Sequence, residues 1–175
     1  MSGGQRKAKR RRDEREDHTG IKIIDFEPDV AASLPATHAL LMSSNLTVHR
    51  SVSKVVLHGS RGLRGGFRSH SDIDLSLIVD PPSGPAIEQH LEQVLETTLS
   101  HWHGPVEPDL AVIFDIQNCG LKCFEQIMWN EQICNVGGTD CFGLYKTQKG
   151  FHGLVTNAGI QIKLIYPCLT IWERR

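Results

Sequence analysis

The sequence contains no long hydrophobic run. Apolar residues make up 39% of its 175 residues, but no stretch approaches the roughly 18 consecutive apolar residues that a membrane-spanning helix requires. No hydrophobic signal region stands near its start, and the number of cysteines, five, is odd, which does not suit a fully paired disulfide framework. These absences predict a soluble, cytoplasmic protein in a reducing environment, with no membrane partner.

The cysteines and histidines of the second half lack the spacing of a structural zinc site. Such sites use ligand pairs that are typically two to four residues apart and come in two sets. Four of the five cysteines, Cys119, Cys123, Cys134 and Cys141, follow one another at spacings of four, eleven and seven positions. The pair His101 and His103 lies near a predicted helix end, where a cap or core-edge residue is the usual role. The sequence therefore does not favour zinc.

Acidic and basic residues are unevenly distributed. The net charge of the chain is -1, yet residues 1–17 carry seven Lys or Arg and four Asp or Glu, which leaves a mildly acidic body. Residues 1–20 have almost nothing apolar to bury, so we expect a disordered charged tail. The basic run at residues 6–12 is either an arm for RNA or another polyanion, or a solvated tail without a specific role.

Hydrophobic spacing predicts the order strand, turn, strand, helix, strand over residues 53–115, with no internal repeat. The strands are expected at residues 21–26, 53–57, 71–79 and 109–115, and the helices at residues 36–46, 85–99 and 119–134, the second of them with Pro85 as its first residue. Ser60 is a good helix N-cap, so a further helix of about one turn is expected directly after it, ended by Gly65 and Gly66. Beyond residue 137, short extended runs predict a small antiparallel extension.

Two aspartates open the second of these strands. Side chains alternate in a strand, so Asp72 and Asp74 lie on one face, about 6 to 7 Å apart. Ile73, Leu75 and Leu77 then fill the opposite face and set the register by burial. Two adjacent carboxylates repel each other unless a cation lies between them. A divalent metal ion is therefore the expected occupant.

A Gly-Ser turn and a glycine-rich arginine loop precede these aspartates. Gly59 allows a sharp turn, and the start of a helix after a strand would offer unpaired N–H groups to a phosphate. Guanidinium groups suit phosphate oxygens. The candidate phosphate ligands are Gly59, Ser60, Arg61, Arg64 and Arg68, with His58 and His70 as flanking neighbours.

The run GSRGLRGGFRSHSDIDL, residues 59–75, resembles the DNA polymerase β-like nucleotidyltransferase superfamily, most closely its minimal, single-domain members. The resemblance covers residues 53–115 and implies an α+β fold with α/β-like strand order, in which a mixed β-sheet is backed by helices. Residues 21–136 would form this nucleotidyltransferase core, and residues 137–175 a small β-rich C-terminal extension of the same domain.

The resemblance also implies the site. Asp72, Asp74 and a third carboxylate would hold two Mg²⁺ ions, with Mn²⁺ as a substitute. Asp109 matches the third position best because it opens a strand, while Asp115 and Glu107 stay open as alternatives. A hydroxyl would attack the α-phosphate of a nucleoside triphosphate, with ATP as the first expectation, and pyrophosphate would leave.

The acceptor of the nucleotidyl group is not apparent from the sequence. Acceptors in the superfamily include protein hydroxyls, nucleic-acid ends and small molecules. The resemblance also includes a rival class, a nucleotide-binding regulatory module such as one half of a toxin–antitoxin pair, which works beside a partner chain. The complete set of acidic residues favours an enzyme.

Overall fold

The computed structural model describes residues 20–133, 142–148, 153–155 and 165–175. The expected charged tail lies outside these residues, except for Gly20, which begins the first strand. Cys134 and Cys141 of the zinc alternative also lie outside them, as does most of the extended run IQIKLIY.

Three α-helices, one 3₁₀ helix and eight strands make up the described chain. In order they are β1 (Gly20–Lys22), α1 (Pro28–Ser33), α2 (Pro35–Ser43), β2 (Thr47–His49), β3 (Val52–His58), β4 (Ile73–Val79), α3 (Ile87–His101), β5 (Pro108–Asp115), η1 (Lys122–Glu125), β6 (Phe142–Lys146), β7 (Gly153–Val155) and β8 (Leu169–Glu173). This confirms the expected alternation of strand, turn, strand, helix and strand through the middle of the chain.

A six-stranded mixed sheet forms the centre of the fold, in the order β7-β6-β5-β4-β3-β8. The pair β4–β5 is parallel, and every other neighbouring pair is antiparallel. The segment expected as a C-terminal extension supplies strands at both edges, because β6 and β7 continue the sheet beside β5 while β8 lies beside β3. Strands β1 and β2 form a separate two-stranded sheet.

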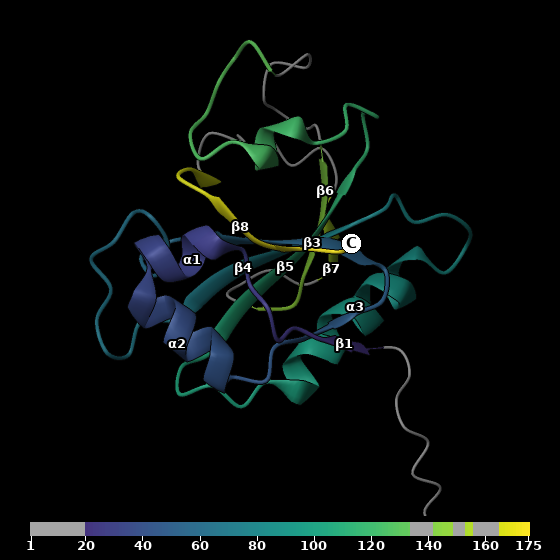
Figure 1. The fold of residues 1–175 in the computed structure, drawn as a ribbon. Helices are drawn as coiled ribbons and strands as arrows, with labels where there is room; N and C mark the ends of the chain where they lie inside the picture. The colour runs from purple at the N-terminus through teal and green to yellow at the C-terminus, as the bar shows by residue number, and fades with distance from the viewer. Residues whose placement is uncertain (1–19, 134–141, 149–152, 156–164) are drawn as a thin grey trace, which may run out of the picture.

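Helices cover one face of the main sheet, below it in Figure 1. Ile73, Leu75 and Leu77 are buried in this layer, as the alternation in β4 predicts. Leu91 and Leu95 of α3 pack in the same core cluster. A hydrophobic stripe at three- and four-residue spacing thus fixes α3 against the sheet.

A second, smaller core lies on the opposite face of the sheet, toward η1, which is above the sheet in Figure 1. Val56, Ile78 and Ile113 point to this side from three adjacent strands, and Phe124 of η1 is buried against them. This second core covers only part of the face, and the acidic end of β4 and β5 lies beyond it.

The prediction of a helix over residues 119–134 is wrong. Over the described residues of this range, 119–133, only the short η1 forms, and it starts after Gly120 and Leu121, whose φ angles of 78° and 48° are left-handed. Asp115 fixes this turn, since its carboxylate accepts hydrogen bonds from the backbone N–H groups of Gln117 and Gly120, at 3.1 and 2.6 Å. A local turn therefore replaces the first turn of a helix.

The prediction of a short helix after Ser60 is also wrong. Residues 60–64 form turns, in which the N–H groups of Gly62 and Gly65 bond to the carbonyls three residues earlier, at 3.1 and 3.2 Å. Gly59 has a φ of 69°, which ends β3 abruptly. No helix N-terminus stands here to bind a phosphate.

Three further expectations differ only in their bounds. Helix α3 begins at Ile87 and not at the predicted Pro85. The first strand is shorter than predicted, because it ends at Lys22. The predicted helix over residues 36–46 forms as α2, starts at Pro35 and ends at Ser43. Over the described residues, none of the helices combines the length and apolar character needed to cross a bilayer.

We expect Leu95→Ala to lower the free energy of unfolding by about 2 to 5 kcal/mol, because it leaves a cavity between α3 and the sheet. The matched control is Gln93→Ala on the exposed side of α3, with an expected change within about 0.5 kcal/mol. Urea unfolding measures both. Equal effects of the two substitutions would contradict the assigned helix face.

Candidate functional site

Three aspartates meet at one end of the paired strands β4 and β5. Asp72, Asp74 and Asp109 each place one carboxylate oxygen so that all three oxygens lie within 4.8 Å of one another. Among the described residues, no other set of three or more His, Cys, Asp or Glu side chains is arranged in this way. The structure therefore brings together the three carboxylates that the sequence singled out.

The strand register explains this convergence. Asp74 is paired with Asp109 across the parallel β4–β5 ladder, and paired residues project to the same face of a sheet. A hydrogen bond of 3.0 Å from the N–H of Ile73, the first residue of β4, to the carbonyl of Glu107 extends the ladder to the residue before β5. Asp72 thus stands one step before the ladder, on the same face as Asp74.

The two alternatives for the third carboxylate do not join the cluster. Asp115 lies at the other end of β5, where its carboxylate accepts a hydrogen bond from the turn before η1. Glu107 is exposed and contributes its backbone carbonyl to the ladder. Asp109 therefore completes the acidic cluster in the described structure.

Gly59 lies against the acidic cluster. A Cβ atom at this position would stand 2.0 Å from Oδ2 of Asp74, far inside van der Waals contact. The backbone of the turn and the carboxylate of Asp74 are thus neighbours, with room for glycine alone. Any ligand bound along this turn would lie beside the acidic cluster.

Arg61 has a structural role instead of an open phosphate contact. The residue is 5% exposed, and its guanidinium donates hydrogen bonds to the carbonyls of Arg68, Ser69 and Ser71, at 3.2, 3.2 and 2.7 Å. Its carbon Cζ also lies 4.7 Å from the ring centre of Phe67. These contacts fold the arginine loop back onto its start and fix the backbone directly before Asp72.

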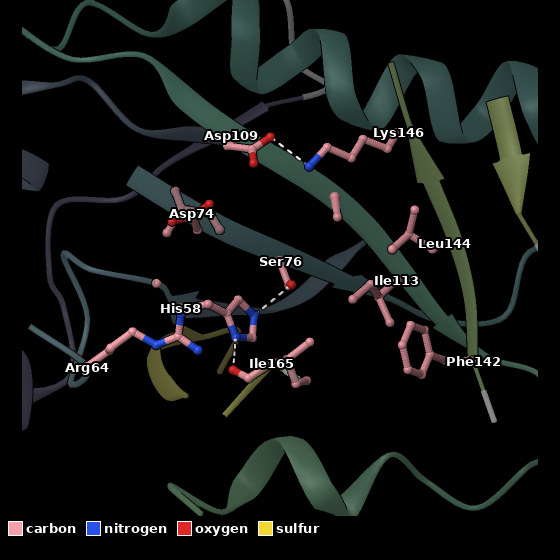
Figure 2. A pocket seen from close by; sticks show the side chains of 13 residues that line it. His58, Arg64, Asp74, Ser76, Asp109, Ile113, Phe142, Leu144, Lys146 and Ile165 are labelled. Atoms are coloured by element: carbon pink, nitrogen blue, oxygen red, sulfur yellow. Dashed lines mark hydrogen bonds and ion pairs between the residues drawn. The ribbon is translucent and has the colours of Figure 1, made fainter. Parts of the chain in front are cut away.

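The other predicted phosphate ligands divide into two groups. Gly59 and Arg64 line a pocket beside the acidic cluster, and Figure 2 shows Arg64 reaching toward it from the loop. Ser60, Arg68 and His70 are not among the pocket's lining residues. Of these three, Arg68 and His70 are exposed, and Ser60 is half-buried.

The pocket has a volume of about 320 Å³ and two chemically different ends. Asp74 and Asp109 stand at the polar end, as Figure 2 shows. The other end is apolar, formed by Ala111, Ile113, Phe142, Leu144 and Ile165. The pocket can hold a ligand that is anionic and cation-bound at one end and flat or apolar at the other.

A histidine and a serine form a hydrogen-bonded pair in this pocket. Nε2 of His58 lies 2.7 Å from Oγ of Ser76, and Nδ1 lies 3.0 Å from the carbonyl of Ile165. Burial lowers the pKa of His58 from 6.5 to about 4. With a neutral ring, Nδ1–H donates to the carbonyl, and Nε2 accepts from the serine hydroxyl.

The sequence did not point to Lys146 and Gln148, which support Asp109. Nζ of Lys146 lies 2.7 Å from Oδ1 of Asp109. The side-chain amide of Gln148 accepts from the N–H of Leu110 at 3.0 Å and donates to the carbonyl of Pro108 at 3.1 Å. Alternation in the run FGLYK puts Lys146 on one face with Leu144, but only the pairing of β6 with β5 reveals which face this is.

The donor chemistry of the cluster fits a hard divalent cation. Carboxylate oxygens are preferred by Mg²⁺ and Mn²⁺. Two oxygens on opposite sides of one Mg²⁺ are about 4.2 Å apart, close to the 4.8 Å within which the three oxygens lie. Small side-chain movements would therefore let the three aspartates hold such an ion.

We expect Arg61→Met to lower the free energy of unfolding by about 2 to 4 kcal/mol, because three carbonyls of the loop lose the charged donor that the buried Arg61 supplies. Arg61→Lys should be destabilising as well, since one ammonium group cannot match the guanidinium fork. Arg64→Met, in an exposed position of the same loop, is the control, with a change within about 0.5 kcal/mol. Urea unfolding would refute this role if all three variants were as stable as the parent protein.

We also expect His58 to make stability depend on pH. The pKa is lower in the folded than in the unfolded protein, so the unfolded chain binds more protons between pH 6.5 and about 4. The contribution of His58 to the free energy of unfolding is therefore complete above pH 6.5, and the free energy of unfolding falls by about 3 kcal/mol as the pH drops through this range. His58→Gln should remove this part of the slope in unfolding measured at several pH values. An unchanged slope in the variant would contradict the assignment.

Comparison with known proteins does not place the chain in a family. No protein-family model, no curated protein and no solved structure matches it. The chemistry of the site is therefore interpreted from its own residues.

Proposed function

We propose that this protein is a metal-dependent nucleotidyltransferase, which moves a nucleoside monophosphate from a nucleoside triphosphate to an acceptor hydroxyl. The observation that carries the proposal is the meeting of Asp72, Asp74 and Asp109 at one end of two parallel strands. Their sequence context, a Gly-Ser turn before an Asp-Ile-Asp strand, resembles that of the DNA polymerase β-like superfamily.

The surroundings of the cluster suit a triphosphate. The turn at Gly59 lies directly against Asp74, so phosphates bound along the turn would stand next to the carboxylates. Arg64 lines the same pocket and supplies an exposed positive charge for phosphate oxygens. The apolar end of the pocket accepts a nucleobase or an apolar part of the acceptor.

The reaction forms a bond between the acceptor oxygen and the α-phosphorus and breaks the bond from that phosphorus to pyrophosphate, which leaves. Asp72, Asp74 and Asp109 would hold the divalent cation, which when bound neutralises phosphate charge and lowers the pKa of the attacking hydroxyl. In this proposal Asp109 would also accept the proton of that hydroxyl. Catalysis is then chiefly positioning and charge compensation.

The proposal predicts that the full chain, incubated with α-labelled nucleoside triphosphates, Mg²⁺ or Mn²⁺ and a cell lysate, transfers label to protein, RNA or a small molecule. Asp72→Asn or Asp74→Asn should reduce the transfer about a thousandfold, since a metal ligand contributes several kcal/mol to the transition state. Both variants should keep the folded structure, as judged by circular dichroism.

The matched control is Asp115→Asn, which changes a carboxylate at the opposite end of β5 and keeps an amide oxygen for the turn. This variant should retain transfer. Full activity of the Asp72→Asn, Asp74→Asn double variant would rule out the metal assignment. A lack of label on any acceptor, together with tight nucleotide binding, would instead favour the regulatory-module class.

A further inference from the structure

The ammonium group of Lys146 lies at the acidic cluster, so the protein itself supplies a positive charge there. Lys146 is the last residue of β6 and shares a face with Phe142 and Leu144, which line the same pocket. Its side chain crosses from β6 to β5, where Nζ lies 2.7 Å from Oδ1 of Asp109 (Figure 2). The two side chains are only 14% and 9% exposed, so water screens this ion pair weakly.

The backbone around this ion pair is fixed on both sides of Asp109. Gln148, two residues after Lys146, bonds through its amide to Pro108 and Leu110, the two neighbours of Asp109. The end of β6 is thereby tied to the beginning of β5. Lys146 is consequently held beside Asp109 by contacts that do not involve the carboxylate.

The charge of the site has a direct consequence for cation binding. The ammonium group of Lys146 offsets the charge of one of the three carboxylates, that of Asp109. A second divalent cation on Asp109 would meet the ammonium group at close range, where like charges repel strongly in a partly buried site. Lys146 and such a cation therefore compete for the same oxygen.

We propose that Lys146 occupies on Asp109 the place of a second divalent cation, so that the protein binds a single metal ion while no nucleotide is present. Lys146 is a positioning residue in this account, and its ammonium group sets the number of ions in the site. The inference deepens the proposed function and rests on it in one respect, namely that the three aspartates bind a divalent metal.

The test is a titration of the full chain with Mn²⁺ alone, without nucleotide, in which free Mn²⁺ is measured by electron paramagnetic resonance. The parent protein should bind one Mn²⁺ per chain. Lys146→Met, which keeps most of the length of the side chain but removes its charge, should bind a second ion. The first ion should also bind about tenfold more tightly, because a positive charge has left the site.

Two further variants separate the charge of Lys146 from its packing. Lys146→Arg keeps the positive charge and should still bind one ion. The double variant Lys146→Met, Asp109→Asn removes the negative charge for which the cations compete, because an amide replaces the carboxylate, and should return to one ion. Should Lys146→Met not fold, as judged by thermal unfolding, Lys146→Gln is the neutral replacement for the same titration.

The outcomes distinguish this inference from the proposed function. Two ions bound by the parent protein, or one ion bound by the neutral variant, would overturn the role of Lys146 and leave the metal site intact. No Mn²⁺ bound by either protein would overturn the metal site, and with it both proposals. One ion in the parent and two in the neutral variant would support the inference.

Discussion

The site depends on the parallel pairing of β4 with β5. Parallel neighbours cannot be joined by a tight turn, so the chain must cross over between them, and α3 provides this crossover. Its apolar side packs on the face of the sheet opposite the acids. The same packing that buries Leu91 and Leu95 therefore sets Asp74 opposite Asp109 in register. Burial of apolar surface is the dominant stabilising term of the fold. It therefore holds together a cluster of like charges.

Much of this part of the fold could be predicted from local patterns. Alternation in β4 put Ile73 and Leu75 in the core and the two aspartates on the other face, as the structure has them. The spacing of apolar residues in α3 and the apolar run of β5 were equally clear. In each case one segment contains its own signal, because its buried face is filled by its own side chains.

The features that the sequence did not reveal depend on partners far along the chain or on competing local bonds. The expected helix over residues 119–134 gave way to a turn bonded by Asp115, which a helical periodicity does not show. Arg61 suited a phosphate as well as it suits carbonyl oxygens, and only the folded loop shows that the carbonyls bind it. Lys146 meets Asp109 across two strands that are distant in sequence.

The place of β8 has a consequence for the order in which the fold can assemble. Val56 of β3 pairs with Thr170 of β8, so the two strands are 114 positions apart in the chain. During synthesis, β3 and β4 can pair early, yet one edge of β3 keeps its hydrogen-bonding groups open until β8 has been made. Contacts of such long range are formed late and slowly. The strand that leads into Gly59 is therefore fixed on both sides only after β8, which ends at Glu173, has been made.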